Sequence, residues 1–419
     1  MTYRNRELLS LLAVAAITGV GFASVYIARQ EAISSASLSY GAFFLCLYLA
    51  AHLVIRFFAP DADPYLLPLA GLLTAIGVTE IYRIEPADAL RQSTWIVVGT
   101  VAFSAILVLL PDPRRLERYK YLIGLGAICL LALPALPVIG ARVNGARLWV
   151  DLGLVRFQPG ELAKVLMVVF LAAYLREKRE VLAQGRLKDL GPLLSVWGAA
   201  MLVIVETNDL GSALLYFGIF IAMLYAATGR VVYVALGAVL FGAGSAAAYA
   251  TIPRVRERVE TWLDPWADPQ GAGYQTVQGL YSVGSGGYGG AGLGRGTFAS
   301  PEGTPYIPFL KTDFIFSALA QELGLIGTSA FLLVVMLLVL RGFRVALLAD
   351  DGFSKLLATG LTFGLALQTF IIAGGVLRLI PLTGITLPFV SYGGSSIVSS
   401  FLALALLARI SHRTEARRP

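Results

Sequence analysis

The segment "LKTDFIF" (310–316) places a carboxylate, Asp313, directly before a long apolar run. A carboxylate at the edge of a membrane segment is costly and usually has a function. Thr312 is predicted to cap the following helix, with Asp313 in its first turn, where the helix dipole would keep the carboxylate ionised. An ionised carboxylate acts as a base or a metal ligand rather than as a proton donor. Two roles stay open for Asp313: helix cap and catalyst.

Chemistry based on histidine or cysteine is nearly excluded. The two histidines are His52, in an apolar run, and His412, in the basic C-terminal segment. The two cysteines, Cys46 and Cys129, also lie in apolar runs and show no CxxC metal spacing and no disulfide framework. Acid–base chemistry must therefore rest on carboxylates, lysines or tyrosines.

Two further acidic positions lie within apolar runs. In "QPGELAKV" (158–165), Glu161 and Lys164 are three residues apart and share a face of the helix that Pro159 is predicted to start. They either form an ion pair that holds helices together or belong to a polar cavity for a charged ligand. Glu322 lies deeper on the helix that follows Asp313, where charge is expensive.

Three polar segments complete the candidate set. In the long loop 252–312, Arg254, Arg256 and Arg258 alternate with other residues, and "GSGGYG" matches GxGxxG without the strand–turn–helix context of a dinucleotide site. The glycine tract is either a flexible tether or, with Arg295, a cradle for phosphate or sugar hydroxyls. Asp209 is placed to cap a helix. The stretch 378–396 is broken by prolines and glycines, which a membrane tolerates only where backbone lines a cavity or is covered by protein.

The elements that must position these residues are membrane helices. Of 419 residues, 57% are hydrophobic and 14% are charged, against roughly 25% charged in soluble domains. Apolar runs long enough to span a bilayer fall near 8–28, 38–58, 65–83, 92–111, 118–138, 158–176, 190–206, 210–228, 231–251, 313–340, 355–378 and 393–410. The sequence predicts an all-α, polytopic membrane helix bundle of about 12 transmembrane helices, the first of them uncleaved.

The distribution of basic residues predicts the orientation. Lys and Arg concentrate in 112–120, in 176–189 and in the tail, which would therefore lie in the cytoplasm together with both termini. The segments 139–157, 252–312 and 379–392 would lie on the outer face. The net charge of +7 then reflects topology, and no nucleic acid partner is expected.

The motifs together resemble the SEDS family of bacterial cell-wall proteins, which includes RodA, FtsW and SpoVE. The matching stretches are "VNGARLWVDLG", "RFQPGELAK", "NDLGSALL", "DPWADPQGAGYQTVQ", "GSGGYGGAGLGRG", "TDFIFSALAQELGLIG" and "PLTGITLPFVSYGGSS". They predict a core at 63–410 with the extracytoplasmic loop 252–312, two extra N-terminal transmembrane helices at 1–62 and a basic cytoplasmic tail at 411–419. Lys311, Gly160 and Arg378 depart from the usual family residues His, Ser and Gly, as in actinobacterial RodA-like members.

The resemblance implies a peptidoglycan glycosyltransferase in the bacterial cytoplasmic membrane. Such enzymes polymerise lipid II on the outer face, release undecaprenyl pyrophosphate and work with a class B penicillin-binding protein. The essential aspartate of the family falls on Asp313, and its Glu–Lys pair falls on Glu161 and Lys164. The enzyme would embed in membrane lipids, with its polyprenyl substrates in apolar grooves between helices.

The expected reaction joins a sugar 4-hydroxyl to the anomeric carbon of a donor that carries a lipid pyrophosphate. Asp313 is the candidate base, and a divalent cation, Mg²⁺ or Mn²⁺, would be shared by Asp313 and the pyrophosphate. A single carboxylate favours inverting displacement. Arginine suits phosphate oxygens. The candidate substrate-binding residues are Arg147, Glu161, Lys164, Arg256, Arg258, Lys311, Ser391, Gly393 and Gly394, with Arg378 as a further cation for the pyrophosphate.

Two other function classes compete with this hypothesis. A lipid II flippase or transporter would also bury charges such as Glu161, Lys164 and Glu322, but it needs polar access from both faces and often shows inverted repeats, which this sequence lacks. A non-catalytic scaffold for a penicillin-binding protein would leave Asp313 and the broken stretch 378–396 unexplained.

Overall fold

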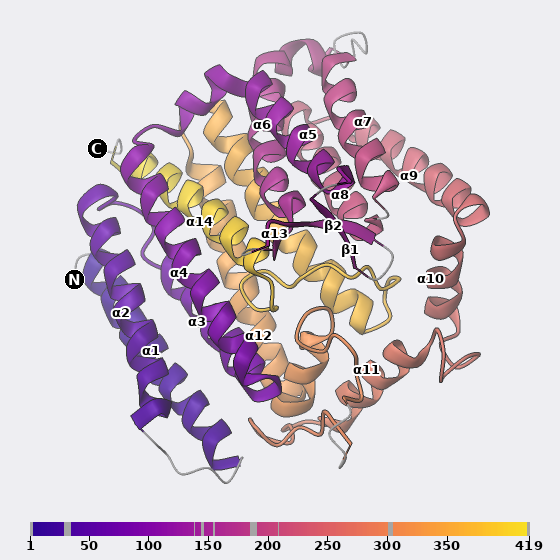
Figure 1. The fold of residues 1–419 in the computed structure, drawn as a ribbon. Helices are drawn as coiled ribbons and strands as arrows, with labels where there is room; N and C mark the ends of the chain where they lie inside the picture. The colour runs from indigo at the N-terminus through magenta and orange to yellow at the C-terminus, as the bar shows by residue number, and fades with distance from the viewer. Residues whose placement is uncertain are drawn as a thin grey trace.

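The computed structural model describes residues 3–28, 35–137, 139–143, 146–153, 156–184, 191–207, 209–300 and 305–416, which form a helical bundle with one small sheet (Figure 1). The α-helices are α1 (Tyr3–Ala28), α2 (Ser35–Phe58), α3 (Leu66–Ile84), α4 (Pro86–Leu109), α5 (Lys120–Ala132), α6 (Pro159–Ala183), α7 (Gly191–Glu206), α8 (Leu210–Thr228), α9 (Val231–Thr251), α10 (Pro253–Leu263), α11 (Tyr274–Ser285), α12 (Ile315–Leu348), α13 (Gly352–Val376) and α14 (Gly394–Glu415). Short 3₁₀ helices are η1 (Pro113–Tyr119) and η2 (Leu133–Ala135), and the strands are β1 (Gly140–Val143), β2 (Ala146–Asp151) and β3 (Arg156–Phe157).

Each of the twelve predicted apolar runs overlaps one α-helix, of which α5 is the shortest. Among the described residues, nine helices are long and apolar enough to cross a membrane, and α7 is a shorter apolar helix. The prediction of an all-α, multi-span membrane bundle is therefore confirmed. The run 118–138 differs in detail: α5 ends at Ala132 and passes into η2, because Pro134 cannot donate the backbone hydrogen bond that a continuing helix needs.

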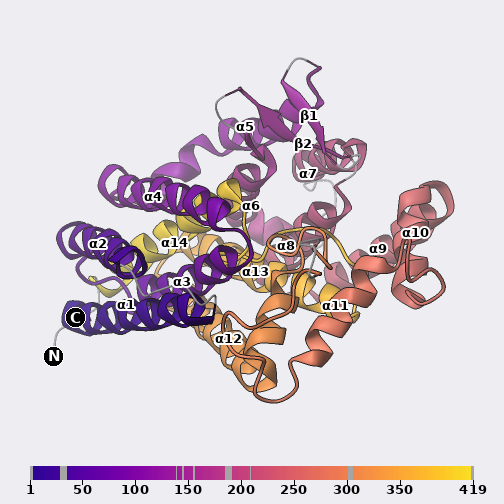
Figure 2. The ribbon, with the colours of Figure 1, turned by 60° about the horizontal axis from the view of Figure 1, so that its bottom comes forward.

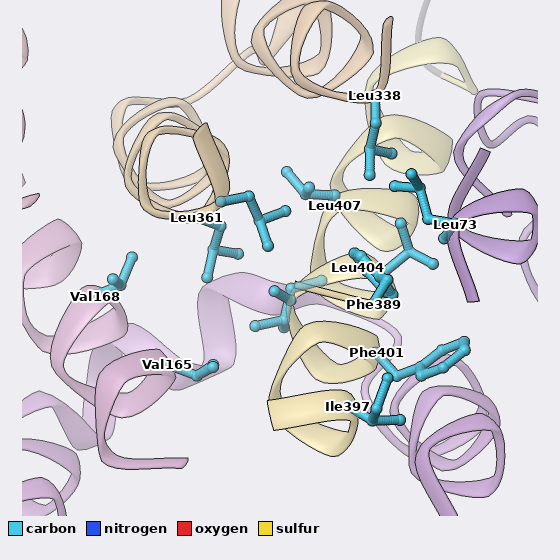
Figure 3. Close-up of a cluster of buried hydrophobic side chains, with 14 of the residues drawn as sticks. Leu73, Val165, Val168, Leu338, Leu361, Phe389, Ile397, Phe401, Leu404 and Leu407 are labelled. Atoms are coloured by element: carbon cyan, nitrogen blue, oxygen red, sulfur yellow. The ribbon is translucent and has the colours of Figure 1, made fainter. Parts of the chain in front are cut away.

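Helix α14 lies at the centre of the bundle. Its apolar side chains pack against α3, α6, α12 and α13 (Figure 3); the residues labelled there are Leu73, Val165, Val168, Leu338, Leu361, Phe389, Ile397, Phe401, Leu404 and Leu407. Phe401 packs edge-to-face with Phe103 of α4 and with Phe389, at ring-centroid distances of 6.4 and 5.7 Å. This central packing anchors α14 directly behind the non-helical segment 377–393.

The connections between helices gather at two ends of the bundle. At one end, Arg4 of α1 donates to Ala62 O, and the neighbouring Asp61 N donates to His412 Nδ1 of α14 (3.2 Å), so the first turns of α1 and the end of α14 lie close to each other. At the other end lie the sheet, α10, α11 and residues 377–393, a set that we call the loop end. Figure 2 shows α9 and α10 projecting from the bundle beside it.

The small antiparallel sheet β1–β2–β3 lies at the loop end. Residues 139–157 were predicted only as an outer loop, although their Asn-Gly pair is a strong β-hairpin signal. The backbone N–H of Arg147 in β2 donates to Thr207 O (3.3 Å), which ties the sheet to the connection between α7 and α8. Asp209 caps α8 as predicted, since its side chain accepts from Ser212 N.

Residues 284–296, which we call the glycine tract, form hydrogen bonds across a break in α12. Gly324 has non-helical angles, φ 64° and ψ −171°, which interrupt the helical hydrogen bonds on both sides. The tract supplies the missing partners: Ala291 N and Gly292 N donate to Gln321 O and Glu322 O (2.9 Å each). On the other side of the break, Leu325 N and Ile326 N donate to carbonyls of the tract at 2.9 and 3.1 Å. A free tether is therefore the wrong interpretation of this segment.

The anion bound by the glycine tract belongs to the protein itself. Gly294 N and Gly296 N donate to the two carboxylate oxygens of Glu322, at 2.7 and 2.9 Å. Arg83 of α3 approaches the same carboxylate at 3.4 Å. These contacts also account for Glu322, whose buried charge the sequence left unexplained. Successive backbone N–H groups do form an anion cradle, but it holds Glu322 in place of a phosphate.

Candidate active site

A charged cleft of about 340 Å³ opens at the loop end, between α10, α11, the end of α13 and the turn that carries Asp313. Its charged lining residues are Arg254, Glu257, Arg258, Asp313 and Arg378. Concave sites with a few converging polar groups are the usual places for ligand binding and catalysis. Among the hollows of the described structure, this one brings a carboxylate and several guanidinium groups together.

Asp313 lies in a turn just before α12. The helix begins at Ile315, and its N-cap residue is Phe314, which makes no side-chain cap bond. The predicted cap at Thr312 is therefore wrong, since its hydroxyl donates to Phe309 O (2.9 Å). The turn closes earlier because Phe309 adopts φ 60° and its carbonyl also accepts from Asp313 N (3.2 Å). Left-handed backbone at a non-glycine residue costs about 1–3 kcal/mol and is concentrated at functional sites.

Burial sets the protonation of Asp313. Desolvation raises the pKa of its carboxyl to about 6, while the hydroxyl of Thr312 and the positive charge of Arg258 lower it. The pKa is raised because removal from water disfavours the charged form. The sequence predicted that a helix dipole would hold this group ionised, whereas the structure makes burial the dominant effect. At neutral pH the group is still mostly ionised, and a base with this pKa is well matched to proton transfer.

Arg258 is the guanidinium group that faces Asp313. Its Nη1 donates to Thr383 O in the non-helical segment (3.2 Å). A Cβ atom at the next residue, Gly384, would lie 3.4 Å from Asp313 Oδ2 and 4.0 Å from Arg258 Nη2. Gly384 also has φ 72°, a conformation that favours glycine. The absence of a side chain there keeps the space beside the carboxylate and the guanidinium open.

Arg378 ties α10 to the end of α13. Its Nε donates to Trp262 O (2.7 Å), and Trp262 Nε1 donates back to Arg378 O (3.1 Å). Its guanidinium also lies 5.3 Å from the ring centroid of Trp266. Arg378 has φ 61°, a second left-handed residue in the cleft lining. It fixes the position of α10, and thereby of Arg258, while one side of it faces the cleft.

Three predicted cations lie outside the cleft lining in the described structure. Arg256 turns back toward α9, where its Nη2 donates to Ala250 O (3.1 Å). Lys311 forms an ion pair with Asp88 of α4 and lies 5.7 Å from the ring of Tyr392. Arg147 lies in β2, and its backbone N–H donates to Thr207 O between α7 and α8. Their predicted contact with substrate finds no support in this arrangement.

The helical period explains why Arg258 reaches the cleft and Arg256 does not. Pro253 is the first residue of α10, a typical start signal. The cleft residues Arg254, Glu257/Arg258 and Thr261/Trp262 recur at intervals of three to four and so share one face of that helix. The alternating pattern of the arginines does not indicate that Glu257 and Trp262 share this face, and neither was predicted as a site residue. Gly384 was also missed, although it lies in the quoted segment "PLTGITLP".

Ser391, Gly393 and Gly394 support the Asp313 turn from behind. The buried Ser391 Oγ accepts from Leu387 N (2.8 Å) and donates to Thr312 O (2.7 Å). Gly393 N donates to Gln92 Oε1 of α4 (3.1 Å). Gly394 packs against the ring of Trp95, where a Cβ would come within 2.2 Å of ring carbons. The structure places these residues in packing contacts rather than in the cleft.

The two neighbouring glycines give a matched stability test. Gly394→Ala should destabilise the fold by about 1–3 kcal/mol, because the ring of Trp95 must move. Gly393→Ala should destabilise the fold less, because the nearest atom to its new Cβ would be a methyl carbon of Thr386 at 3.4 Å. The melting temperature of the detergent-solubilised variants measures the difference. Equal melting temperatures for the two variants would contradict the packing role of Gly394.

Glu161 and Lys164 form an internal ion pair at 2.8 Å. Lys164 Nζ also donates to Gln368 Oε1 of α13 (2.7 Å), and Gln368 Nε2 donates to Thr386 O (2.7 Å). The adjoining cavity has a volume of only about 20 Å³, which is room for about one water molecule. Of the two interpretations, the structure supports the ion pair that connects helices. Through Gln368 it also holds the segment that carries Gly384.

The comparisons with known proteins identify the family of this chain. Residues 65–416 match the family described as "Cell cycle protein", whose members are FtsW, RodA and SpoVE. The chain belongs to this family. A relative named peptidoglycan glycosyltransferase RodA, from Mycobacterium bovis, is 43% identical over 439 aligned residues, which cover 100% of this chain and 92% of that protein. The resemblance to actinobacterial RodA-like members is thus confirmed.

Two solved structures show the same family architecture. One belongs to a peptidoglycan synthase complex described as coordinating polymerization and crosslinking (28% identity, TM-score 0.71, covering 85% of this chain and 99% of that chain). The other is RodA of Thermus thermophilus (26% identity, TM-score 0.62, covering 87% and 100%). The family match begins at residue 65, after α1 and α2.

Proposed function

We propose that this protein is a peptidoglycan glycosyltransferase that polymerises glycan strands from lipid II and releases undecaprenyl pyrophosphate. The observation that carries the proposal is the cleft in which Asp313, with its pKa raised to about 6, lies beside Arg258. The name of the Mycobacterium relative, peptidoglycan glycosyltransferase RodA, supports the reaction class.

Asp313 and Arg258 each have a task in this reaction. Asp313 accepts the proton of the acceptor sugar 4-hydroxyl as that oxygen attacks the anomeric carbon of the donor. The new C–O bond forms while the bond to the lipid pyrophosphate breaks, and the pyrophosphate leaves with the bonding electrons. Arg258 stabilises the negative charge that develops on the leaving group. A single attack on the face opposite the pyrophosphate inverts the anomeric configuration.

A divalent cation of the hard type is a further proposal for the cleft. Mg²⁺ in phosphate-transferring sites keeps several waters and uses one or two carboxylates together with substrate phosphates. Asp313 and Glu257 are the carboxylates that line the cleft. A bound Mg²⁺ or Mn²⁺ would supply positive charge for the pyrophosphate, with Asp313 as its proposed ligand.

The proposed orientation places the cleft outside the cell and both termini in the cytoplasm. It is supported by the gathering of the polar segments at the loop end and by the basic residues of 112–120 and of the tail at the other end. The proposed partner is a class B penicillin-binding protein that crosslinks the glycan. A related chain in a synthase complex that couples polymerization and crosslinking supports that assignment.

The decisive experiment is polymerisation of lipid II by the purified full chain, with and without a class B partner, followed on a gel that resolves glycan strands. Glycan product from the chain identifies a polymerase. Movement of labelled lipid II across vesicle membranes without polymer would instead favour the alternative, a flippase. If neither activity is found and the partner alone is stimulated, the chain is a scaffold.

The pKa of Asp313 predicts the acid limb of the pH–rate profile. The base must be deprotonated, so the rate of lipid II consumption should fall as the pH drops through about 6. Below that value the fall should be about tenfold per pH unit, as for one essential base. Initial rates between pH 4.5 and 8, after a check that the protein stays folded, measure it. A flat profile down to pH 5 would contradict the assignment.

A further inference from the structure

A second hollow, of about 230 Å³, lies beside the charged cleft at the loop end. It lies between α11, residues 297–298 and 306–307, and the first turns of α12. Its lining residues are Gln278, Tyr281, Ser282, Ser285, Thr297, Phe298, Tyr306, Ile307 and Gln321. Nothing in the proposed reaction uses these side chains, which we call the neutral hollow.

The exposed lining of the neutral hollow is mostly apolar, and the polar side chains within it carry no charge. It offers three hydroxyl groups from serine and threonine, two carboxamides and two phenols, together with the apolar side chains of Phe298 and Ile307. Carboxamides and hydroxyls both donate and accept hydrogen bonds. Aromatic rings give flat apolar surface with a polar end in tyrosine. This combination suits a ligand rich in hydroxyl groups and without charge, which is the chemistry of sugar rings.

Hydrogen bonds to α12 and within one wall hold the lining of the hollow in place. Ser282 Oγ bridges to Gln321 Oε1 (3.2 Å) and Ser317 O (3.3 Å) of α12. Tyr306 N donates to Phe298 O (2.9 Å), which joins the two chain segments of one wall. Tyr281, by contrast, is 59% exposed and stands at the rim. A fixed floor and an open aromatic rim reduce the cost of ordering on binding.

The neutral hollow and the charged cleft both border α11, on different faces of that helix. Gln275 and Thr276 in the first turn of α11 line the cleft, and Gln278, Ser282 and Ser285 line the hollow. At 1.5 Å per residue, the two sets are separated by only about 10 Å along the helix. The connecting segment also borders both, since Tyr306 and Ile307 line the hollow and Phe309 lines the cleft.

The hollow is also placed where an aqueous polymer could reach it. Residues 325–348 of α12, beyond the break at Gly324, span about 36 Å at 1.5 Å per residue. That length alone crosses a hydrocarbon core of about 30 Å. The preceding turns, which carry Gln321, are therefore not needed to cross the hydrocarbon core.

We propose that the neutral hollow is a binding subsite for the sugar rings of the glycan strand, next to the charged cleft where the bond forms. The inference rests on the proposed function, because the strand is the product of that reaction. It divides the loop end by charge: the cleft takes the pyrophosphate, and the hollow takes uncharged saccharide. Binding of the strand here would keep the growing polymer on the enzyme between successive additions.

Binding of a lipid-free glycan tests this directly. The probe is a peptidoglycan glycan oligomer from which the lipid and the stem peptides have been removed, titrated against the full chain in nanodiscs. Gln278→Ala and Tyr281→Ala should each weaken binding by about fivefold, the scale of one lost hydrogen bond. The same variants should give shorter glycan strands in the polymerisation assay. Tyr288→Ala is the matched control, since Tyr288 is 78% exposed on the glycine tract.

The outcomes separate the two proposals. If the wild-type chain polymerises lipid II but does not bind the oligomer, or binds it equally well in Gln278→Ala and Tyr281→Ala, the subsite is wrong and the proposed function stands. Oligomer binding lost in Arg258→Gln but kept in both hollow variants would place the strand in the cleft and also overturn the subsite. If no polymer forms at all, the proposed function fails by its own assay.

Discussion

Asp313→Asn should lower lipid II polymerisation by about 10²–10⁴-fold, the contribution of a general base. The amide keeps the size of the side chain but cannot accept the proton of the attacking hydroxyl. Folding should be unaffected or slightly improved, because the substitution removes a charge that burial penalises. The measurement is the glycan product formed by purified protein from labelled lipid II, with the melting temperature recorded for each preparation.

The matched control is Asp350→Asn, the same change at an exposed position between α12 and α13. It should keep full activity. A folded Asp313→Asn protein that still yields substantial glycan would remove Asp313 from the role of base. The residual activity of the variant should also lack the acid limb near pH 6, since no titrating carboxyl remains at that position.

Arg258→Gln should lower the same rate by about 10²–10³-fold, the usual loss when one group that stabilises developing charge is removed. Loss of Arg258 should also lower the rate in a second way, through the protonation of Asp313. Arg258 lowers the pKa of Asp313, so its removal should raise that pKa and shift the acid limb to higher pH. Arg258→Lys should recover part of the rate, because it keeps the charge without the planar fork of the guanidinium.

Arg256→Gln is the comparison for Arg258, two residues away on the same helix. Because Arg256 donates to Ala250 O and lies outside the cleft lining, its loss should be much smaller. If the two variants lost activity to a similar extent, the total positive charge of α10 would matter rather than the contact of Arg258 with the cleft. An unshifted acid limb in Arg258→Gln would show that Arg258 does not affect the pKa of Asp313, whatever the size of the rate change.

The site depends on three chain segments that meet at Gly384. The turn 309–313 brings Asp313, α10 brings Arg258, and the segment 377–393 brings the glycine between them. The Glu161–Lys164 pair reaches the same segment through Gln368 and Thr386. The half-buried charges of Glu161 and Lys164 therefore act on the cleft by holding its wall, a role that differs from ligand binding.

The sequence by itself determined the helices and the leading residue of the site. Long apolar runs have few solutions in a membrane other than spanning helices, because every backbone polar group needs an internal partner. The same reasoning predicted a broken, protein-covered stretch at 378–396, and the structure is non-helical there up to residue 393, after which α14 begins. The scarcity of histidine pointed to carboxylates. Asp313 and the Glu161–Lys164 pair followed from local position, and the family motifs from their order along the chain.

Only the tertiary structure decided which of the charged groups meet. Arg258 and Arg256 have the same local sequence context, and the direction of the α10 face separates them. Lys311 adjoins Asp313 in sequence but pairs with Asp88 of α4. Glu322 proved to be the anion of the glycine tract, across 28 residues of chain. Charges are long-ranged and nonspecific, so their partners depend on how distant segments pack, which residue type and spacing do not encode.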